Sequence, residues 1–540
     1  MALELQPLSK IYLHSSAYDY DVQTQTSDIR VVYIFSLIAI FTLLIACINF
    51  MNLATARSER RMREVGMRKV IGATKIQLIR QFISESILMA FLAMFIAVFL
   101  VELLLPFFNS IFIKHMSFIK SFNIVGMLVL LAFVLFTGFI AGSYPAFFLS
   151  SFLPINSLQG KQKKGNEKSL IRKLLVVGQF TVSIVLIIMT TVLYKQLHFM
   201  QHKKLGYDKE RMVSIPMSQE IKSRYEALKN SFLESSDVVS FTAADNLPNW
   251  QGPSYYLEEW EGRNTDKIIK MHECTVDYDY FKTFDMEIIQ GRTFSRDFST
   301  DMDSALLINE EAARQMNMTA PVGKHLGSSE NERQIIGVVK DFHHDSLRNR
   351  IQPMTFQLDP ENTNYLIFRL STGVLPEKLV YLEDKWKKII LNHPFSYYFL
   401  DQVLNRNYQP EIIIGKAISF FSILAILIAS LGLFGLAAFT AEQSTKEIGI
   451  RKILGASSLE IFTLLAKDFT LRVAAAGIIA LPLSYLGAVT FLKNYAFRTS
   501  LGVLVFILPI LASLFLALLI VSYQSIRASL INPSTFLRYE

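Results

Sequence analysis

The sequence predicts a polytopic α-helical membrane protein with about seven transmembrane helices and one mixed α/β extracytoplasmic domain. Two observations lead to this prediction. The chain of 540 residues is 51% hydrophobic and has a mean hydropathy of +0.33, which is high for a soluble protein. Its apolar residues are also gathered into long runs, and only one long stretch between these runs is polar.

Seven apolar runs are each long enough to cross the roughly 30 Å hydrocarbon layer of a membrane. An odd number of crossings places the two ends of the chain on opposite sides of that membrane. The runs cover residues 31–53, 82–108, 123–147, 174–194, 412–439, 469–491 and 501–523.

Basic residues predict the orientation of these helices. Lysines and arginines crowd the loops after the first and third runs, at residues 57–80 and 161–173, and the positive-inside rule places such loops in the cytoplasm. The N-terminus is then outside and the C-terminus is cytoplasmic. The same alternation makes the polar stretch at 195–411 extracytoplasmic.

The net charge of +8 comes mainly from residues beside apolar runs. They do not form one surface of basic and aromatic residues, so we expect no nucleic-acid partner. The two cysteines, Cys47 and Cys274, cannot build a disulfide framework or a thiolate metal site within one chain.

The usual signatures of catalysis are missing. The sequence has no phosphate-binding loop of the form G-x-x-x-x-G-K-[ST], no H-E-x-x-H pair and no G-x-S-x-G elbow. We therefore expect no enzyme activity, cofactor or metal, and any energy source must come from a partner. Ionisable residues avoid the middle of the apolar runs, which argues against a transporter driven by a proton or sodium gradient.

A ten-residue segment is repeated in the two halves of the chain. Residues 64–73 (EVGMRKVIGA) recur as residues 447–456 (EIGIRKILGA), and both copies follow an apolar run. A second match follows the last run of each half, where Tyr144, Pro154 and Leu158 keep the spacing of Tyr523, Pro533 and Leu537. The chain therefore holds two three-helix units.

Each copy of the segment places a glutamate four residues before an arginine, which supports a short helix with exposed basic side chains. A glycine then ends the helix. A single basic loop would only fix topology, whereas a cytoplasmic helix presented twice suits docking onto a partner with two-fold symmetry. The candidate docking residues are Glu64, Gly66, Arg68, Lys69, Gly72, Glu447, Gly449, Arg451, Lys452 and Gly455.

The polar stretch predicts two strand–helix–strand units separated by an insertion, as in a mixed α/β domain. In each unit, a helix with one apolar face lies between two strands. The first unit covers residues 212–217, 219–234 and 238–243, and the second covers residues 365–370, 376–391 and 396–400.

Residues 341–345 (DFHHD) bring two imidazoles and two carboxylates together, as a metal site does. Adjacent residues point in different directions, however, and no second spaced pair of ligands is evident. We therefore expect a loop with solvated histidines here.

Taken together, these segments resemble the FtsX/MacB-type permeases of ABC transporters, particularly the duplicated form common in Bacteroidetes. The resemblance rests on residues 57–73, 447–456 and 532–540, and on the outside segments 279–284, 291–294 and 336–342. It implies a permease subunit in the bacterial inner membrane, bound to a separate ABC ATPase that binds the ATP. Movement of that ATPase would reach the periplasmic domain through the helices, for export or mechanotransmission. A periplasmic protein or lipoprotein is a further possible partner.

The duplicated family pattern has one more helix and one more periplasmic domain than this chain, and residues 5–14 resemble the end of that missing domain. The expected domains are an extracytoplasmic N-terminal tail (1–30), a first FtsX-like three-helix unit (31–150), a basic cytoplasmic linker (151–173), a transmembrane helix (174–195), a MacB-like periplasmic domain (196–411) and a second FtsX-like unit (412–540).

A second function fits the same residues. The chain could be a membrane-tethered binding or regulatory module that recruits or activates a periplasmic partner without transport. Assays of substrate accumulation separate the two functions. The sequence names neither the cargo nor the ATPase.

Overall fold

The computed structural model describes residues 7, 8, 10, 29–112, 116–117, 123–150, 166–248, 253–264, 266–327, 332–406 and 408–529. The chain divides into two compact units. The membrane unit comprises Met1–Lys195, Glu411–Phe491 and Ser500–Glu540, and the α/β domain comprises Gln196–Pro410 and Leu492–Thr499. Most of the predicted N-terminal tail, part of the basic linker, and the matched residues Pro154, Leu158, Pro533 and Leu537 lie outside the described residues.

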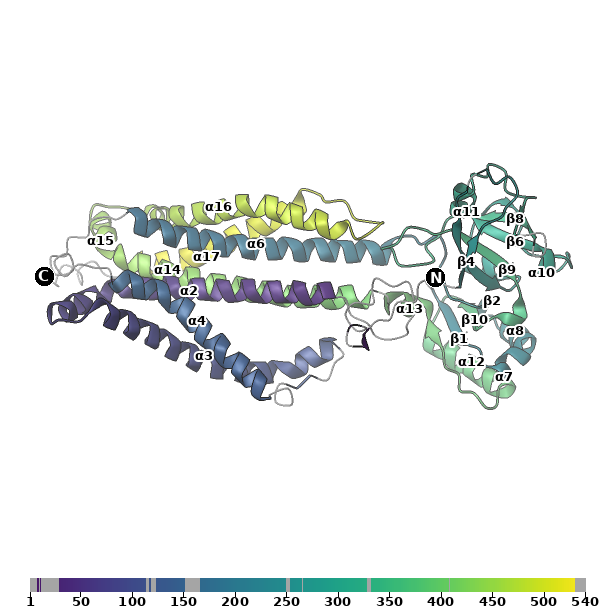
Figure 1. Cartoon of the computed structure of the whole chain (residues 1–540), viewed down its shortest axis with the longest axis horizontal. Coiled ribbons are helices and arrows are strands. Elements are labelled where there is room, and N and C mark those ends of the chain that lie inside the picture. Colours follow the sequence, from purple (N-terminus) through teal and green to yellow (C-terminus); the bar gives the residue numbers. More distant parts are fainter. Residues whose placement is uncertain are drawn as a thin grey trace. The chain divides into compact units, whose positions relative to one another are not determined.

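Seven helices among the described residues are long and apolar enough to cross a membrane, which confirms the predicted number (Figure 1). Several continue well beyond their apolar stretch, because the flanking residues also favour helix. The helices are α2 (Ile29–Val70), α3 (Lys75–Phe112), α4 (Ile124–Ser150), α6 (Asn166–His202), α14 (Gln409–Gln443), α16 (Ser458–Leu492) and α17 (Leu504–Ser529), with the short α15 (Thr445–Ile453) between α14 and α16.

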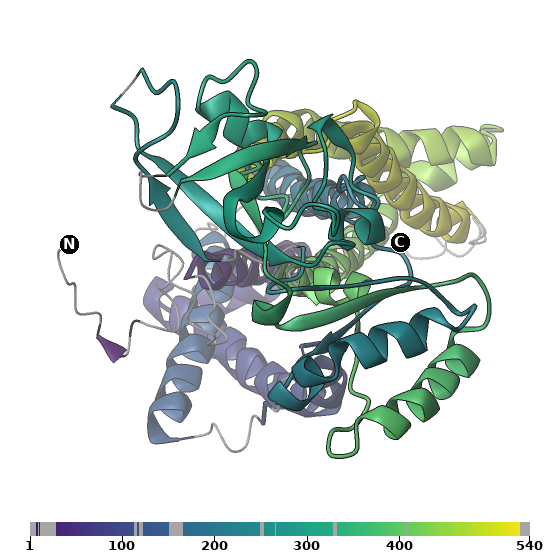
Figure 2. The ribbon, with the colours of Figure 1, turned by 90° about the vertical axis from the view of Figure 1, so that its right-hand side faces the viewer.

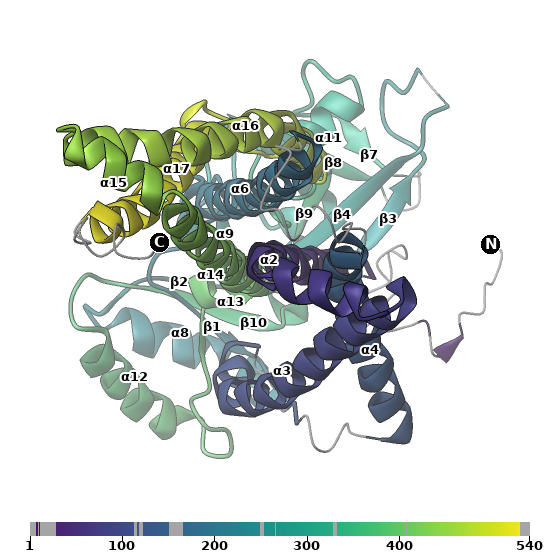
Figure 3. The same cartoon turned by 90° about the vertical axis from the view of Figure 1, so that its left-hand side faces the viewer.

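Small residues let α4 approach α3 closely. A Cβ atom on Gly138 would lie 2.8 Å from the Cα of Ile87, and one on Gly142 would lie 2.6 Å from the side chain of Ser86. Close approach through small residues is how helices pack in the absence of a hydrophobic driving force between them. Figure 3 views the helices end-on and shows α2, α3 and α4 grouped together, apart from α16 and α17.

The two halves of the chain meet along α2 and α14. The Nδ2 atom of Asn49 donates a hydrogen bond to the carbonyl oxygen of Ile428 (3.5 Å), and a Cβ on Gly432 would lie 2.4 Å from the Oδ1 of Asn49. Asn49 and Gly432 are separated by the same 383 positions as Glu64 and Glu447. Equivalent residues of the two repeats therefore face each other, as they do near a two-fold axis.

Helix α6 completes the centre of the membrane unit. The hydroxyls of Thr190 on α6 and Ser422 on α14 are 2.9 Å apart, and Gly415 on α14 leaves room for Leu193. Around these contacts lies an apolar cluster from α2, α6 and α14, formed by Ile38, Ile45, Leu186, Leu193, Ile418 and Ala425.

The α/β domain is built on one mixed sheet of eleven strands. Along the sheet the order is β11-β1-β10-β2-β4-β9-β6-β8-β5, with β3 paired to β4 and β7 paired to β8. The strands are β1 (Met212–Pro216), β2 (Val238–Ala244), β3 (Ser254–Leu257), β4 (Ile269–Val276), β5 (Ile288–Gly291), β6 (Ala305–Asn309), β7 (His325–Leu326), β8 (Arg333–Val339), β9 (Met354–Leu358), β10 (Tyr365–Leu370) and β11 (Tyr398–Phe399).

The two predicted strand–helix–strand units are present, and their strands interleave. Strand β10 of the second unit lies between β1 and β2 of the first, antiparallel to both. The predicted first helix is broken at Arg224 into α7 (Gln219–Ser223) and α8 (Tyr225–Leu233), and the last strand is shorter than predicted. The second helix, α12 (Leu375–Ile389), lies beside α8 on one face of the sheet, seen as the green and teal helices of Figure 2.

Aromatic residues fill the space between these helices and the sheet. Phe232 of α8 packs against Phe241 and Phe368, with ring centroids 5.9 and 5.4 Å apart, and Trp386 of α12 is fully buried. Buried aromatic side chains of this size supply much of a domain's apolar burial. The remaining helices are α9 (Tyr280–Phe284), α10 (Asp301–Ser304), α11 (Glu310–Gln315), the 3-10 turn η3 (Pro360–Asn362) and α13 (Leu400–Arg406).

The loop that follows α16 belongs to the α/β domain. The N–H groups of Ala496 and Phe497 donate to the carbonyl oxygens of Arg348 (2.9 Å) and Leu347 (3.3 Å). The buried side chain of Gln196 donates to the carbonyl of Phe497 (2.9 Å) and accepts from the N–H of Thr499 (2.8 Å). These bonds tie residues 496–499 to segments far away in the sequence.

Candidate docking site

The repeated segment forms the same turn in both halves of the chain, and we call residues 64–77 and 447–460 the first and second elbow. In the first elbow α2 ends at Val70, Gly72 has φ +104°, and the N–H of Ala73 donates to the carbonyl of Arg68 (2.9 Å). A bond over five residues with a glycine in the left-handed region is the Schellman ending of a helix.

The second elbow repeats this ending. Gly455 has φ +92°, and the N–H of Ala456 donates to the carbonyl of Arg451 (2.9 Å). Glycine adopts such a φ without the clash that a Cβ would bring. Both predicted helix stops are therefore where the sequence placed them.

The next helix starts with a capping box in each elbow. The N–H of Gln77 donates to the Oγ1 of Thr74 (3.3 Å), and the N–H of Thr74 donates back to the side chain of Gln77 (2.9 Å). Ser457 and Glu460 make the matching pair of bonds, at 3.3 and 3.0 Å. Such reciprocal bonds satisfy two free N–H groups and fix the start of the helix, so both elbows have a defined shape.

The predicted Glu–Arg pairs form in both elbows. Glu64 and Arg68 are 2.7 Å apart, and Glu447 and Arg451 are also 2.7 Å apart. All four side chains are about half exposed. Exposed pairs of this spacing contribute only about 0.3–0.5 kcal/mol to helix stability.

The other candidate residues differ in how far they are exposed to solvent. Gly66 is buried, and Gly449 is half-buried. The Nζ of Lys69 donates to the carbonyl of Ser150 at the end of α4 (2.7 Å), so this lysine is engaged within the chain. Lys452 lies in α15, and its side chain is outside the described part of the chain.

The structure adds exposed apolar side chains that sequence reasoning missed. Ile71 and Leu454 hold equivalent positions at the tips of the elbows, and each is 80% exposed. Contiguous exposed apolar residues mark interaction surfaces. The signal was present in the sequence, as apolar residues repeated within otherwise charged segments. The four equivalent exposed pairs are Met67 and Ile450, Val70 and Ile453, Ile71 and Leu454, and Ile76 and Leu459.

A hollow of about 660 Å³ lies beside the second elbow. Its walls combine apolar side chains with one carboxylate and two cations. The lining residues are Arg451, Leu454, Gly455, Ala456, Glu460, Ile461, Thr463, Leu464 and Lys467.

The histidines of residues 341–345 are not solvated, so that prediction was wrong. His343 and His344 are 9% and 2% exposed, because β4 and the loop after α16 cover them: the ring of His344 lies 5.7 Å from that of His272, and His343 lies 4.4 Å from Phe497. Burial lowers the pKa of each to about 4. Among the described residues, no group of three or more histidine, cysteine or acidic side chains could hold a metal ion.

Comparisons with known proteins agree with the repeat. The family described as FtsX-like permease C-terminal matches residues 36–154 and 419–532, which are the two three-helix units. No curated protein matches the chain.

Three solved structures are similar to part of the chain. The periplasmic region of MacB from Actinobacillus actinomycetemcomitans has 15% identity and a TM-score of 0.27, covering 38% of this chain and 97% of that one. A domain of a permease protein from Porphyromonas gingivalis has 21% identity and a TM-score of 0.25, covering 33% and 84%. The extracellular domain of the noncanonic ABC-type transporter YknZ from Gram-positive bacteria has 13% identity and a TM-score of 0.22, covering 36% and 92%.

The two matched segments coincide with the two helical units, each of which contains one elbow, and the units meet at Asn49 and Gly432. The chain is a multi-pass membrane protein that carries the FtsX-like permease domain twice.

Proposed function

We propose that this chain is the permease subunit of an ABC transporter, and that the two elbows dock onto a separate ATPase that binds ATP. The observation that carries the proposal is the duplicated elbow, which presents the same ion pair and the same apolar tip in each half. ABC ATPases act as pairs, and a pair of equal surfaces on the permease matches a two-fold partner.

Movement of the ATPase would then reach the α/β domain through the helices. Helices α6 and α14 run directly into that domain, and the loop after α16 is hydrogen-bonded within it. A domain joined at three places follows displacements of the helices. Export and mechanotransmission both use this arrangement.

We further propose that the protein lies in the bacterial inner membrane with the elbows in the cytoplasm, the α/β domain in the periplasm and the C-terminus inside. The density of lysine and arginine near the first elbow supports this orientation. Fusions at the C-terminus test it: green fluorescent protein should fluoresce there, and alkaline phosphatase should be inactive.

The docking proposal is tested by purifying the tagged full-length chain in detergent from its native membrane and identifying co-purifying ATPases by mass spectrometry. The double variant Ile71→Asp with Leu454→Asp should lose the ATPase, since a carboxylate replaces each apolar tip. Arg68→Glu with Arg451→Glu should weaken the contact as well.

Leu391→Asp is the matched control, because Leu391 is 76% exposed in the α/β domain and away from both elbows. This control should retain the ATPase. Undiminished recovery of the ATPase by both elbow variants would contradict the docking role. Failure of the unaltered chain to bind any ATPase would favour the membrane-tethered module instead.

A further inference from the structure

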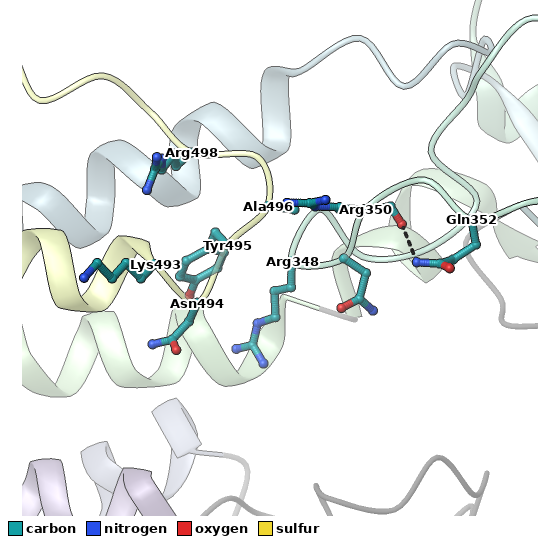
Figure 4. A pocket seen from close by; sticks show the side chains of 9 residues that line it. Arg348, Arg350, Gln352, Lys493, Asn494, Tyr495, Ala496 and Arg498 are labelled. Carbon is teal, nitrogen blue, oxygen red and sulfur yellow. Dashed lines mark hydrogen bonds between the residues drawn. The ribbon is translucent and has the colours of Figure 1, made fainter. Parts of the chain in front are cut away.

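A pocket of about 460 Å³ lies within the α/β domain, between two segments that are distant in the sequence (Figure 4). One segment, residues 348–352, follows β8. The other, residues 493–498, follows α16. The pocket is lined by Arg348, Asn349, Arg350, Gln352, Lys493, Asn494, Tyr495, Ala496 and Arg498.

Backbone hydrogen bonds and a buried aromatic residue hold the walls of the pocket in place. The backbone bonds from Ala496 and Phe497 to the 347–348 segment hold its two walls together, and Tyr495 is 6% exposed, with the Arg348 guanidinium 5.7 Å from its ring centre. The side chain of Gln352 donates to the carbonyl of Arg350 (3.1 Å), as the dashed line in Figure 4 marks. A ligand would therefore meet groups that are already positioned.

The charge of the lining is entirely positive. Four of the nine residues are lysine or arginine, and none is acidic. Within the described part of the chain, Arg350, Lys493 and Arg498 are exposed and form no ion pair. The carboxylate nearest in sequence, Asp345, already accepts hydrogen bonds from the side chain of Asn349 and the N–H of Ser346. Cations gathered in one concave site raise the local concentration of anions.

In the sequence, one wall of the pocket, residues 493–498, lies between two candidate membrane spans. Lys493 directly follows the span that ends at Leu492, and the next span starts at Leu504. The connecting residues are too few to carry the loop far from the membrane surface. Lysine and arginine at such a position extend toward lipid phosphates.

We propose that this pocket binds a phosphate group, and that the membrane supplies it as the headgroup of an anionic lipid. Arginine guanidinium groups match phosphate oxygens with paired donors, and the side-chain amides of Asn349 and Asn494 add neutral donors. The pocket volume suits a headgroup of small-molecule size. Because the loop that carries Lys493 and Arg498 is hydrogen-bonded to the α/β domain, a bound lipid would hold that edge of the domain at the membrane.

The test uses the full-length protein in a neutral detergent. Binding is measured by isothermal titration with dihexanoylphosphatidylglycerol, with inorganic phosphate, and with zwitterionic dihexanoylphosphatidylcholine. The variant Arg350→Gln with Arg498→Gln should bind the anionic lipid at least tenfold more weakly, and the affinity of the unaltered protein should fall as salt is added.

The matched control is Lys282→Gln with Lys388→Gln, which removes two exposed charges of the same domain away from the pocket. Its affinity should stay within twofold of the unaltered protein. Inorganic phosphate that binds as tightly, with the same dependence on Arg350 and Arg498, would identify free phosphate as the source. Equal binding by the pocket variant and the unaltered protein, for both ligands, would overturn the proposal.

Discussion

Replacement of Lys229 by methionine should destabilise the α/β domain. The Nζ of Lys229 on α8 lies 2.8 Å from a carboxylate oxygen of Asp277 and 2.7 Å from one of Asp279. The side chains of Lys229 and Asp277 are only 6% and 2% exposed. The hydroxyl of Tyr225 also donates to Asp277 (2.6 Å). Methionine fills a similar volume but leaves the Asp277 carboxylate buried without its cation.

The size of the effect follows from that burial. Removing one partner of a buried ion pair costs about 3–5 kcal/mol, since the remaining charge cannot reach water. A domain of this size changes its unfolding temperature by about 2–4 °C per kcal/mol. The Lys229→Met variant should therefore unfold roughly 10 °C below the unaltered protein. Adding Asp277→Asn removes the stranded charge and should recover at least half of this loss.

Tryptophan fluorescence gives a selective assay in the full-length protein, because all three tryptophans (Trp250, Trp260 and Trp386) fall in the sequence range 196–410 of the α/β domain. Lys387→Met is the control: this lysine pairs with Glu383 on the exposed side of α12 and should shift unfolding by less than about 1 °C, as surface pairs contribute little. A loss below about 2 °C in Lys229→Met, or no recovery in the double variant, would refute the reasoning.

Two further predictions concern the same domain. Burial lowers the pKa of His344 to about 4; the nearby His272 and His343 add to this shift, and Asp345 opposes it. As the pH falls from 6.5 to 4, the unfolded chain therefore gains a proton at this residue that the folded domain does not gain. The unfolding temperature, followed by tryptophan fluorescence, should therefore drop between pH 6.5 and pH 4, and the drop should be smaller in His344→Gln. An equal dependence of the unfolding temperature on pH in this variant and in the unaltered protein would contradict the prediction. Gly291→Ala should cost roughly 2–5 kcal/mol, because Gly291 has φ +73° and its Cβ would lie 2.1 Å from the carbonyl oxygen of Ile336. Gly323→Ala, where φ is +92° and nothing lies within 4 Å, should cost only the roughly 1–2 kcal/mol of backbone strain, and equal losses for both variants would exclude the steric argument.

The helices and the repeat could be predicted because their signals are local. An apolar run of sufficient length satisfies its own backbone hydrogen bonds only as a helix in lipid. The elbows follow from Gly72 and Gly455, whose positive φ stops each helix, and from the capping residues that come next. None of these features depends on contacts with distant parts of the chain.

The pairing of the strands could not be predicted in the same way. Strand β10 lies between β1 and β2, although more than a hundred residues separate it from β2 in the sequence. No pattern within either strand–helix–strand unit therefore indicates this pairing. The buried histidines were missed for a similar reason. The polar residues of the segment 341–345 suggest exposure to solvent. Strand β4 and Phe497, which are distant in the sequence, cover the two histidines and exclude water from them.

The candidate docking site was partly predictable. The charged pairs Glu64–Arg68 and Glu447–Arg451 could be predicted from spacing within one helix turn. The role of Lys69 could not, because its partner Ser150 belongs to another helix. The tips Ile71 and Leu454 repeat in the sequence within charged segments, but only the structure separates these exposed residues from apolar residues that face inward, as Val65 and Ile448 do.

Helix α16 connects the two surfaces proposed here. Its first turn is capped by Ser457 in the second elbow, and its last residue, Leu492, leads into the loop that the α/β domain holds through Ala496 and Phe497. Helix α16 runs without a break from Ser458 to Leu492, although Pro482 inside it removes one backbone hydrogen bond. We propose that a displacement imposed on the elbow by an ATPase would reach Lys493 and the phosphate pocket along this helix. If the pocket holds a lipid headgroup, the same displacement acts against that anchor, so occupancy of the pocket would alter how far the α/β domain moves.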